Sequence, residues 1–275
     1  MTAMFSIVLV SYNSVEVLGE AIRSIPPGHQ VIVVDNASQD GSAELARSLG
    51  ATVLEMGENL GFGTACNRGA ALALHERLLF LNPDATLNAG ALPALGRAFD
   101  AYPDSIAFNP RILNADGTLF DRRRTILLPR PYWFRPPPPT TDCKIISASG
   151  AALLVRKSEF ERLGGFDEAI FLYYEDDDLS ARIIKSGRTM HLVHDAVVRH
   201  LFSKSSPDTP ALSSFRDYQA MKSRIYVCRK HGIRPMRGMR IVEERIRRFL
   251  ASRRGDARRA ARAEARLRAL MEDRG

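Results

Sequence analysis

The sequence predicts an α/β fold with a mostly parallel central sheet. Short apolar runs rich in β-branched residues alternate with helix-like segments from residue 5 to residue 109. Several of these runs end at polar residues, as the second one does at Asp35. Because parallel strands need a crossover, usually a helix, this alternation is typical of a parallel sheet covered by helices.

The individual elements follow from the spacing of the apolar residues. Strands are expected at residues 5–10, 30–34, 52–55, 78–81 and 106–109, and helices at 12–24, 42–49, 64–75 and 90–101. Beyond residue 109 the pattern changes to a hairpin over 111–128, with its turn at Asp116 and Gly117. We then expect strands at 145–156 and 190–198, a short helix after Ser158, and helices at 176–186 and from 215 onward.

The composition is that of a protein with a sizeable core. The chain has 275 residues, of which 45% are hydrophobic. Its three cysteines, Cys66, Cys143 and Cys228, lack metal-site spacing and are typical of a reducing compartment. The first ten residues lead directly into a predicted strand, and no stretch approaches the ~20 apolar residues of a spanning helix. We therefore expect a cytoplasmic protein.

The positive charge is concentrated near the C-terminus. Residues 230–275 hold 15 Lys and Arg against 6 Asp and Glu, whereas the rest of the chain holds 24 against 25. Residues 231–275 are expected to form a basic amphipathic helical tail, with Ile246, Phe249 and Leu250 on one face. The candidate partners are an anionic membrane surface, nucleic acid, or none beyond solvent. The membrane is favoured, and nucleic acid is not expected because no nucleic-acid module is recognisable.

Four consecutive carboxylates, Glu175 to Asp178, follow two aromatic residues and begin an apolar helical pattern. Like charges this close repel one another, so something must offset their repulsion. One explanation is structural, because the helix dipole stabilises acids at a helix N-terminus by roughly 0.3–1 kcal/mol each. The other explanation, which we favour, is that one carboxylate acts as a general base at the mouth of a cleft.

Other polar residues follow the predicted strands, where ligands of open α/β sheets bind. Asp35 can accept a hydrogen bond from a base N–H or a ribose hydroxyl, and Asp84 can hold a divalent cation against a diphosphate. Both lie in turn-forming sequences, so a plain turn is the alternative in each case. His200, after the last strand, either completes a Mn²⁺ or Mg²⁺ site or is an ordinary buried or surface residue. The glycine-rich run 58–69 suits close approach of a nucleotide or a simple helix entry.

Taken in order, these segments resemble family 2 glycosyltransferases, most closely the rhamnosyltransferase-like branch. The resemblance covers residues 5–230 and includes seven elements at similar spacing. They are Val10-Ser11-Tyr12-Asn13, the Asp35 segment, residues 59–69, Asn82-Pro83-Asp84, Gly150, Gly164-Gly165-Phe166-Asp167 and Glu175-Asp176-Asp177-Asp178-Leu179.

The resemblance implies a GT-A fold, which is Rossmann-like and binds a nucleotide sugar. It implies a domain over residues 1–230, with a donor half at 1–109 and an acceptor and catalytic half at 110–230. The implied donor-binding residues are Ser11, Tyr12, Asn13, Asp35, Asn36, Asn59, Gly63, Asn67, Asn82 and Asp84. Asp84 and His200 are the implied ligands of Mg²⁺ or Mn²⁺. The chain departs from the family pattern after His200, where Leu201, Phe202, Ser203 and Lys204 replace the usual glycines.

The resemblance also implies a catalytic role for Asp176, as the base that deprotonates the acceptor hydroxyl. Glu175 beside it either hydrogen-bonds the acceptor or caps the helix, and Asp178 has the same two alternatives. With one base and no second nucleophile evident, single displacement with inversion is expected. The donor is expected to be deoxythymidine-diphosphate rhamnose or a uridine-diphosphate sugar, and the acceptor a glycan or a lipid-linked glycan of a surface polysaccharide.

Acceptor contacts are also expected in the irregular middle of the chain. Arg124 and Trp133 lie in segments that combine cations with aromatic residues, and these suit phosphate and sugar rings respectively. The alternative is that the charged residues simply face the solvent and the aromatic residue packs against the protein. The alternative to an enzyme is a catalytically silent protein that binds nucleotide sugars or serves as a scaffold. In that case the tail would be its functional region. A nucleotidyltransferase is disfavoured because residues 11–14 offer no glycine-rich phosphate loop.

Overall fold

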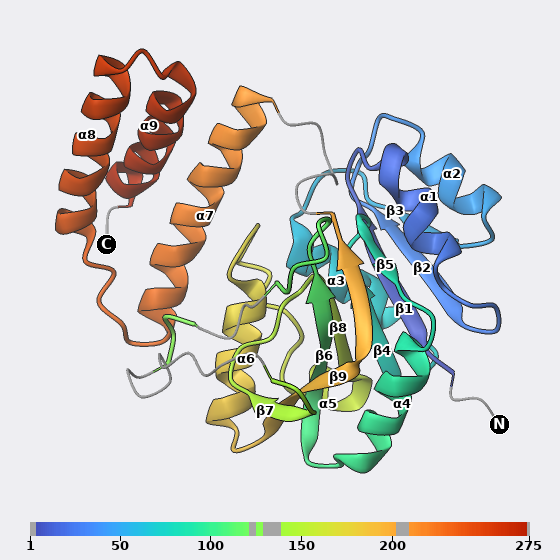
Figure 1. Ribbon diagram of the computed structural model, residues 1–275. Coiled ribbons are helices and arrows are strands. Elements are labelled where there is room, and N and C mark those ends of the chain that lie inside the picture. The colour runs from blue at the N-terminus through green and yellow to red at the C-terminus, as the bar shows by residue number, and fades with distance from the viewer. Residues whose placement is uncertain (1–3, 121–124, 129–138, 202–208, 274–275) are drawn as a thin grey trace. The chain divides into compact units, whose positions relative to one another are not determined.

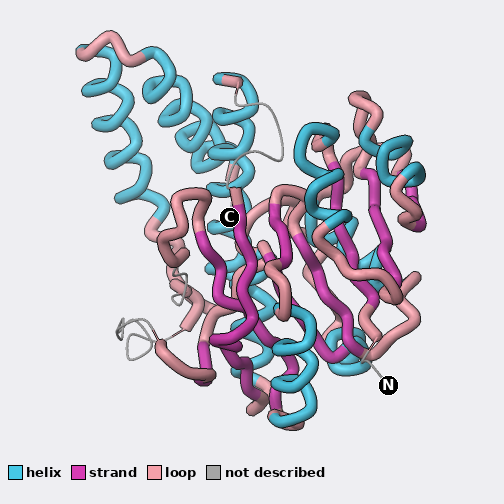
Figure 2. Tube along the Cα trace, turned by 45° about the vertical axis from the view of Figure 1, so that its right-hand side comes forward, coloured by secondary structure: helices cyan, strands magenta, loops and turns pink. Residues whose placement is uncertain are grey.

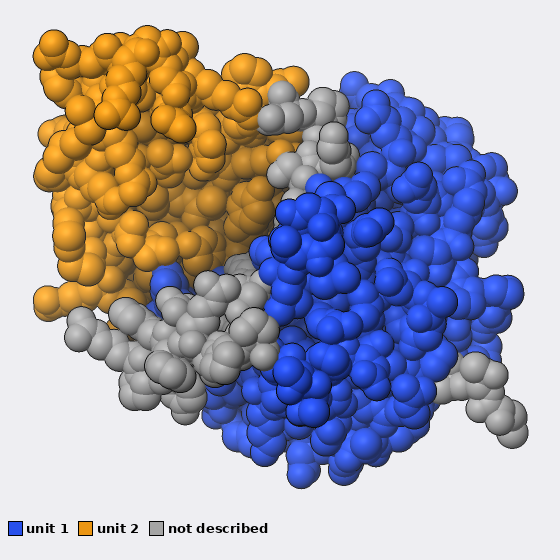
Figure 3. Space-filling model, viewed as in Figure 1, with its two compact units in different colours: residues 1–168, 175–206 blue, residues 169–174, 207–275 orange. Residues whose placement is uncertain are grey.

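The computed structural model describes residues 4–120, 125–128, 139–201 and 209–273. The chain divides into two compact units, which Figure 3 distinguishes by colour. Unit 1 comprises residues 1–168 and 175–206, and unit 2 comprises residues 169–174 and 207–275. Each unit is described by itself below.

The first half of unit 1 is a parallel sheet with helical crossovers, as the sequence predicts (Figure 1). Its strands lie in the order β3-β2-β1-β4. They are β1 (Ser6–Ser11), β2 (Gln30–Asp35), β3 (Thr52–Glu55) and β4 (Arg77–Leu81). The crossover helices are α1 (Val15–Arg23), α2 (Ser42–Ser48) and α3 (Phe62–Ala71). This order brings the carboxyl ends of β2, β1 and β4 together at one edge of the sheet.

The second half of the sheet is mixed rather than purely parallel. Strand β8 (Ala152–Arg156) runs antiparallel to β4 and to β6 (Ser105–Leu113), and β9 (Thr189–His200) runs parallel to β6. Two short strands, β5 (Ala85–Leu87) and β7 (Cys143–Ile145), pair antiparallel with β9. The sequence did not predict β5, and the strand predicted at 145–156 is interrupted at 146–151. The interruption is held by the Asn109 side chain, whose Oδ1 accepts from Ser149 N and whose Nδ2 donates to Ser149 O and Ala152 O.

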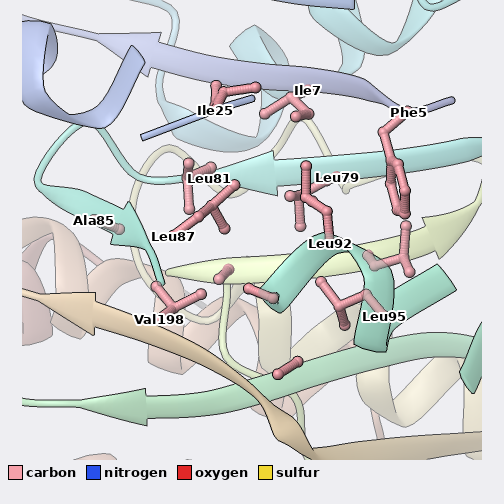
Figure 4. Close-up of a cluster of buried hydrophobic side chains, with 14 of the residues drawn as sticks. Phe5, Ile7, Ile25, Leu79, Leu81, Ala85, Leu87, Leu92, Leu95 and Val198 are labelled. Atoms are coloured by element: carbon pink, nitrogen blue, oxygen red, sulfur yellow. The ribbon is translucent and has the colours of Figure 1, made fainter. Parts of the chain in front are cut away.

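Helices cover both faces of the sheet (Figure 2). On β1, Ile7 and Leu9 point into one hydrophobic cluster and Val8 and Val10 into the other. The first cluster includes residues of α1 and of α4 (Ala91–Ala101), and Figure 4 shows Leu92 and Leu95 of α4 close to Leu79. The second cluster includes residues of α3, α5 (Lys157–Arg162) and α6 (Glu175–Lys185). Burial on both faces explains why these strands have continuous apolar sequences.

Unit 2 contains the helices α7 (Pro210–Lys230), α8 (Arg237–Arg253) and α9 (Ala257–Glu272). The predicted tail is therefore a pair of helices, which turn at Gly255, where φ is +69°, with Asp256 capping α9. Helix α7 packs on α9 through Met221, Ile225 and Leu270. Unit 2 takes up the chain from residue 207, and the domain boundary at 230 that the resemblance implies stays a prediction. No helix in the described part of the chain is long and apolar enough to cross a membrane.

Candidate active site

Two predicted donor residues, Ser11 and Asp35, lie side by side at the carboxyl ends of β1 and β2. They are register partners in the parallel ladder, and both are almost fully buried. Asp35 Oδ1 accepts from Ser38 N at 2.8 Å, which forms the turn considered as the alternative. Asp35 Oδ2 and Ser11 Oγ are buried and have no hydrogen-bond partner within the described residues. Because a buried unpaired polar atom costs about 1–3 kcal/mol, these two atoms are well suited to a ligand's N–H and hydroxyl groups.

Three asparagines organise the loops around this point. Asn36 Nδ2 donates to Asn59 Oδ1 at 2.8 Å, and Asn36 Oδ1 accepts from Leu60 N at 3.0 Å. Asn13, in the left-handed region with φ of 52°, accepts from Gln39 N through its Oδ1 at 2.8 Å. Asn13, Asn36 and Asn59 thus hold the loops after β1, β2 and β3 against one another. Tyr12 lies beside them with a side chain that is 36% exposed, accessible to a ligand.

Gly63 and Asn67 on α3 hold a distant segment of the chain. The Asn67 amide donates to Phe166 O at 2.8 Å and accepts from Phe166 N at 2.9 Å. A Cβ at Gly63 would lie 3.1 Å from Phe166 Cβ, so only glycine allows this approach without a shift. These contacts account for both residues through packing, and their predicted contact with the donor stays a prediction.

Asp84 and His200, which are 116 positions apart, meet at the edge of the sheet. His200 Nε2 lies 2.9 Å from Asp84 Oδ1 and 3.3 Å from Asn82 Nδ2. The pairing of β5 with β9 sets this geometry, because Ala85 is the register partner of His200 and Leu201 N donates to Asp84 O at 3.0 Å. Both side chains are about 5% exposed or less. The alternation in Ala85-Thr86-Leu87 is the sequence signal that could have found β5.

The Asp84–His200 pair offers a carboxylate oxygen and an imidazole nitrogen, which a divalent cation can use as ligands. No group of three or more His, Cys, Asp or Glu residues in the described ranges is arranged to hold a metal ion. Mg²⁺ commonly takes one or two protein ligands and fills the rest of its shell with water and phosphate oxygens. Asp84 Oδ1 and His200 Nε2, which lie 2.9 Å apart, are the two protein atoms that would hold such an ion.

The four consecutive acids begin α6, and all four are buried. Asp176 Oδ2 accepts from Gly150 N at 3.0 Å, and Asp176 Oδ1 accepts from Asp177 N at 2.9 Å. Asp177 Oδ1 accepts from Ser147 Oγ at 3.3 Å. The helix N-terminus and these donors together offset the mutual repulsion of the carboxylates. The structural explanation and a catalytic role for Asp176 are therefore compatible.

Asp178 has a structural partner on its own helix. It is fully buried, and its Oδ2 accepts from Arg182 Nε at 2.8 Å. Arg182 also donates to the carbonyls of Leu163 and Gly165, so the pair fastens the turn before Phe166 to α6. The spacing of four residues between Asp178 and Arg182 is a sequence signal for this pair. The predicted contact of Asp178 with the acceptor remains untested.

The segment at residues 150–151, immediately before β8, links the two predicted centres. Gly150 N binds Asp176, and Ala151 O accepts from Asn82 N at 2.9 Å. Strand β8 pairs with β4, which pairs with β1, so Asp35, Ser11, Asn82 and Asp176 follow one edge of the sheet. Gly150 was expected from the family pattern, but its bond to Asp176 could not be read from the sequence. Arg124 and Trp133, the other predicted acceptor residues, lie outside the described residues.

The backbone is strained immediately before the acids. Tyr173 and Tyr174 have φ of 66° and 71°, in the left-handed region that bulky residues rarely adopt. Both belong to unit 2, where the Tyr174 hydroxyl accepts from Arg224 Nη1 at 2.9 Å and Ser223 Oγ donates to Leu172 O at 2.8 Å. Contacts within unit 2 thus fix the segment from which the chain enters α6.

Comparisons with known proteins found a family model and relatives that match this chain. A model of the family "Glycosyl transferase family 2" matches residues 6–164. An N-acetylglucosaminyl-diphospho-decaprenol L-rhamnosyltransferase from Mycobacterium tuberculosis is 30% identical over 246 residues, covering 77% of this chain and 80% of that protein. A low-salt glycan biosynthesis hexosyltransferase, Agl10 from Haloferax volcanii, is 26% identical over 231 residues, covering 80% of this chain and 73% of that protein.

Solved structures share the fold. The mannosyltransferase PcManGT from Pyrobaculum calidifontis, solved in complex with GDP-Man and Mn²⁺, superposes with a TM-score of 0.59 at 18% identity. The match covers 98% of this chain and 73% of that chain. The predicted fold class is thereby confirmed.

Proposed function

The chain belongs to glycosyltransferase family 2 and is a glycosyltransferase, and from this premise we propose an inverting, metal-dependent enzyme of surface glycan synthesis. It moves a sugar, with rhamnose favoured, from a nucleoside diphosphate to a glycan or lipid-linked acceptor. One observation carries the proposal: the Asp84–His200 pair and the Asp176 carboxylate flank the same short segment, with Asn82 N bound to Ala151 O and Gly150 N bound to Asp176.

The nucleotide is proposed to bind at the ends of β1 and β2. Asp35 Oδ2 is the acceptor for the N–H of a pyrimidine base, and Ser11 Oγ is a second polar group close by. Thymine and uracil present the same N–H and carbonyl edge, so both deoxythymidine-diphosphate rhamnose and uridine-diphosphate sugars fit. Tyr12, Asn13, Asn36 and Asn59 shape this end of the site.

The diphosphate is proposed to lie against Asp84 and His200, the two residues that would hold Mg²⁺ or Mn²⁺. A cation held there would supply positive charge against the negative charge that develops on the leaving diphosphate. Asn82 carries no charge, and its Nδ2 lies 3.3 Å from His200 Nε2.

Asp176 is proposed to take the proton from the attacking acceptor hydroxyl. The Gly150 N–H holds Oδ2, so the carboxylate is oriented by the backbone before substrate binds. Proton transfer to a positioned base contributes roughly 10²–10⁴ in rate. The hydroxyl oxygen forms the new bond at the anomeric carbon as the bond to the diphosphate breaks, so the configuration is inverted. Glu175, buried beside Asp176, has its side chain near Gly63 and Cys66 on α3.

The acceptor is proposed to be lipid-linked. The Mycobacterium relative is, by its name, an L-rhamnosyltransferase of N-acetylglucosaminyl-diphospho-decaprenol, which is a lipid-linked sugar. A cytoplasmic enzyme that rests on the inner face of the membrane through its basic C-terminal helices reaches such an acceptor. Arg124, Trp133 and Asp178 remain the predicted acceptor contacts.

The first experiment measures thermal stabilisation by nucleotide sugars with and without Mn²⁺. The wild-type chain is expected to be stabilised by one thymidine or uridine sugar only when Mn²⁺ is present, and Asp84→Ala is expected to lose this effect. Asp104→Asn, which changes a side chain that is 91% exposed, is the matched control and should behave as the wild type. No stabilisation by any sugar nucleotide contradicts the enzyme and favours the silent scaffold protein.

The second experiment tests the base. Asp176→Asn is expected to lower turnover at least a hundredfold while nucleotide-sugar stabilisation persists. Nuclear magnetic resonance of the wild-type product reports the anomeric configuration. Retention of configuration, or full activity of Asp176→Asn, refutes the mechanism.

A further inference from the structure

A pocket of about 380 Å³ lies between α8 and α9 in unit 2. Five of its eight lining residues are arginines, namely Arg247, Arg254, Arg259, Arg262 and Arg266. The remaining lining residues are Leu250, Ala251 and Asp256. Guanidinium groups present forked N–H donors that match phosphate oxygens, so a pocket of this composition suits a phosphate group.

Acidic residues hold several of these arginines in place. Arg266 bonds to Glu244 at 2.9 Å and to Asp217 at 3.1 Å, and Arg262 bonds to Asp217 at 2.5 Å. Glu244 is buried, and the Asp217 side chain is 17% exposed. Each arginine has five N–H donors and uses only some of them in these pairs. The ion pairs therefore orient the guanidinium groups and leave other N–H donors available to a ligand.

Arg254 and Arg259 are the least engaged of the five. Both are exposed, and the one ion pair of Arg259 within the described residues is with Asp256, at 3.3 Å. Arg254 makes no ion pair with any described residue. These two side chains can therefore be changed without breaking the network that joins the three helices.

The pocket adjoins an apolar stripe on the outer face of α8. Met239, Val242, Ile246, Phe249 and Leu250 recur every three or four residues, and each is 46–58% exposed. The opposite face of α8, with Glu244 and Ala251, is buried in unit 2. Leu250 belongs to both the stripe and the pocket lining, so the apolar and basic surfaces are continuous.

This combination separates the candidate ligands. A free phosphate would use the arginines and leave the stripe in water, and a nucleic acid would do the same. A second copy of the chain would bring together two tails that each carry 14 basic and 6 acidic residues, which is unfavourable. An anionic membrane can bind both surfaces. The apolar stripe would be buried among the acyl chains, and the arginines would bind the phosphates of the head groups.

We propose that the arginine pocket between α8 and α9 binds the phosphate of an anionic phospholipid while the apolar stripe of α8 lies in the membrane interface. This refines the membrane contact suggested above, and its test needs no transferase activity. A loss of vesicle binding is therefore distinguishable from a loss of sugar transfer.

The test measures flotation of the full chain with phosphatidylcholine vesicles, with and without phosphatidylglycerol. The wild-type chain is expected to bind only the anionic vesicles. Each basic residue near an anionic surface contributes ~1 kcal/mol, so R254Q/R259Q should weaken binding roughly tenfold or more. The stripe variant I246S/F249S should also weaken it. The control R23Q/R97Q removes the same charge from exposed positions of unit 1 and should bind like the wild type.

Four outcomes overturn the proposal. In the first, the wild-type chain binds neutral vesicles as strongly as anionic ones. In the second, R254Q/R259Q binds anionic vesicles as strongly as the control R23Q/R97Q. In the third, inorganic phosphate alone raises the thermal stability of the chain and no vesicle binds. The fourth is a dimer in light scattering that I246S/F249S converts to a monomer, because the stripe is then an interface between copies. Circular dichroism of each variant confirms that the helices are intact.

Discussion

At the scale of single residues, the four consecutive acids of α6 have different surroundings. Asp176 accepts from the backbone of Gly150, Asp177 from Ser147, and Asp178 from Arg182. Asp178 is the most buried of the four and has an arginine as partner, whereas Asp176 is oriented by an uncharged donor. The same residue type thus serves stability at one position and is available for chemistry two positions earlier.

The Asp178–Arg182 pair is expected to matter for stability. Asp178→Ala leaves the Arg182 guanidinium, whose side chain is 19% exposed, without its carboxylate. Breaking a largely buried pair should lower the free energy of unfolding by about 3 kcal/mol, as measured by urea denaturation. Lys157–Glu161 is the matched control, since it has the same spacing but Glu161 is 51% exposed. Glu161→Ala should cost less than about 1 kcal/mol, and equal losses in the two variants would contradict the prediction.

Cys66 gives the protein a pH dependence on the alkaline side. Burial first, and the charge of Glu175 second, raise the pKa of the Cys66 thiol well above its ordinary value of 9.0. The folded chain keeps this proton where the unfolded chain loses it. The contribution to stability is therefore complete below the ordinary pKa and is lost as the pH rises through the higher pKa of the folded state. Cys66→Ala should reduce the fall in the free energy of unfolding between neutral and alkaline pH, and an identical fall in both proteins would refute this.

At the scale of elements, the approach of α3 to the sheet depends on a glycine. A Cβ at Gly69 would lie 2.4 Å from Val8 Cγ1 and 3.0 Å from Val34 Cγ2, on two neighbouring strands. Because α3 also positions Gly63 and Asn67 against Phe166, its distance from β1 and β2 bears on the geometry of the site.

Two glycine-to-alanine variants should therefore change stability in opposite directions. Alanine is intrinsically better than glycine in a helix by about 0.8–1.0 kcal/mol. Gly69→Ala should nevertheless destabilise the protein by about 1–3 kcal/mol, because the methyl group overpacks the core. Gly238→Ala in α8, where nothing lies within 4 Å of the added atom, should stabilise it. Thermal unfolding measures both, and a stable Gly69→Ala protein would show that α3 can shift.

At the scale of the whole molecule, the two units carry different kinds of chemistry. Unit 1 holds the edge of the sheet with Asp35, Asp84 and Asp176, and unit 2 holds the arginine pocket and the apolar stripe. Salt weakens the electrostatic interactions of exposed arginines, because the Debye length is about 10 Å at 0.1 M salt. Salt weakens the interactions between buried groups of unit 1 much less.

Salt should therefore separate the two functions. Raising the ionic strength is expected to release the chain from anionic vesicles while sugar transfer to a water-soluble acceptor analogue changes little. Flotation and a transferase assay on the same preparation measure this. If vesicle binding and sugar transfer fall together as the salt concentration rises, the assignment of these two functions to different units is wrong.

The alternation of strands and helices, the buried strands and the polar residues at their ends could all be read from the amino-acid pattern. These features follow from local periodicity and turn chemistry, which lie within short windows of the chain. Three features needed the folded chain: the pairing of β5 with β9 that joins Asp84 to His200, the bond of Gly150 to Asp176, and the folding of the basic tail into two helices around a pocket. These contacts join residues far apart in the chain, and their register depends on the packing of the whole sheet or helix pair rather than on any local pattern.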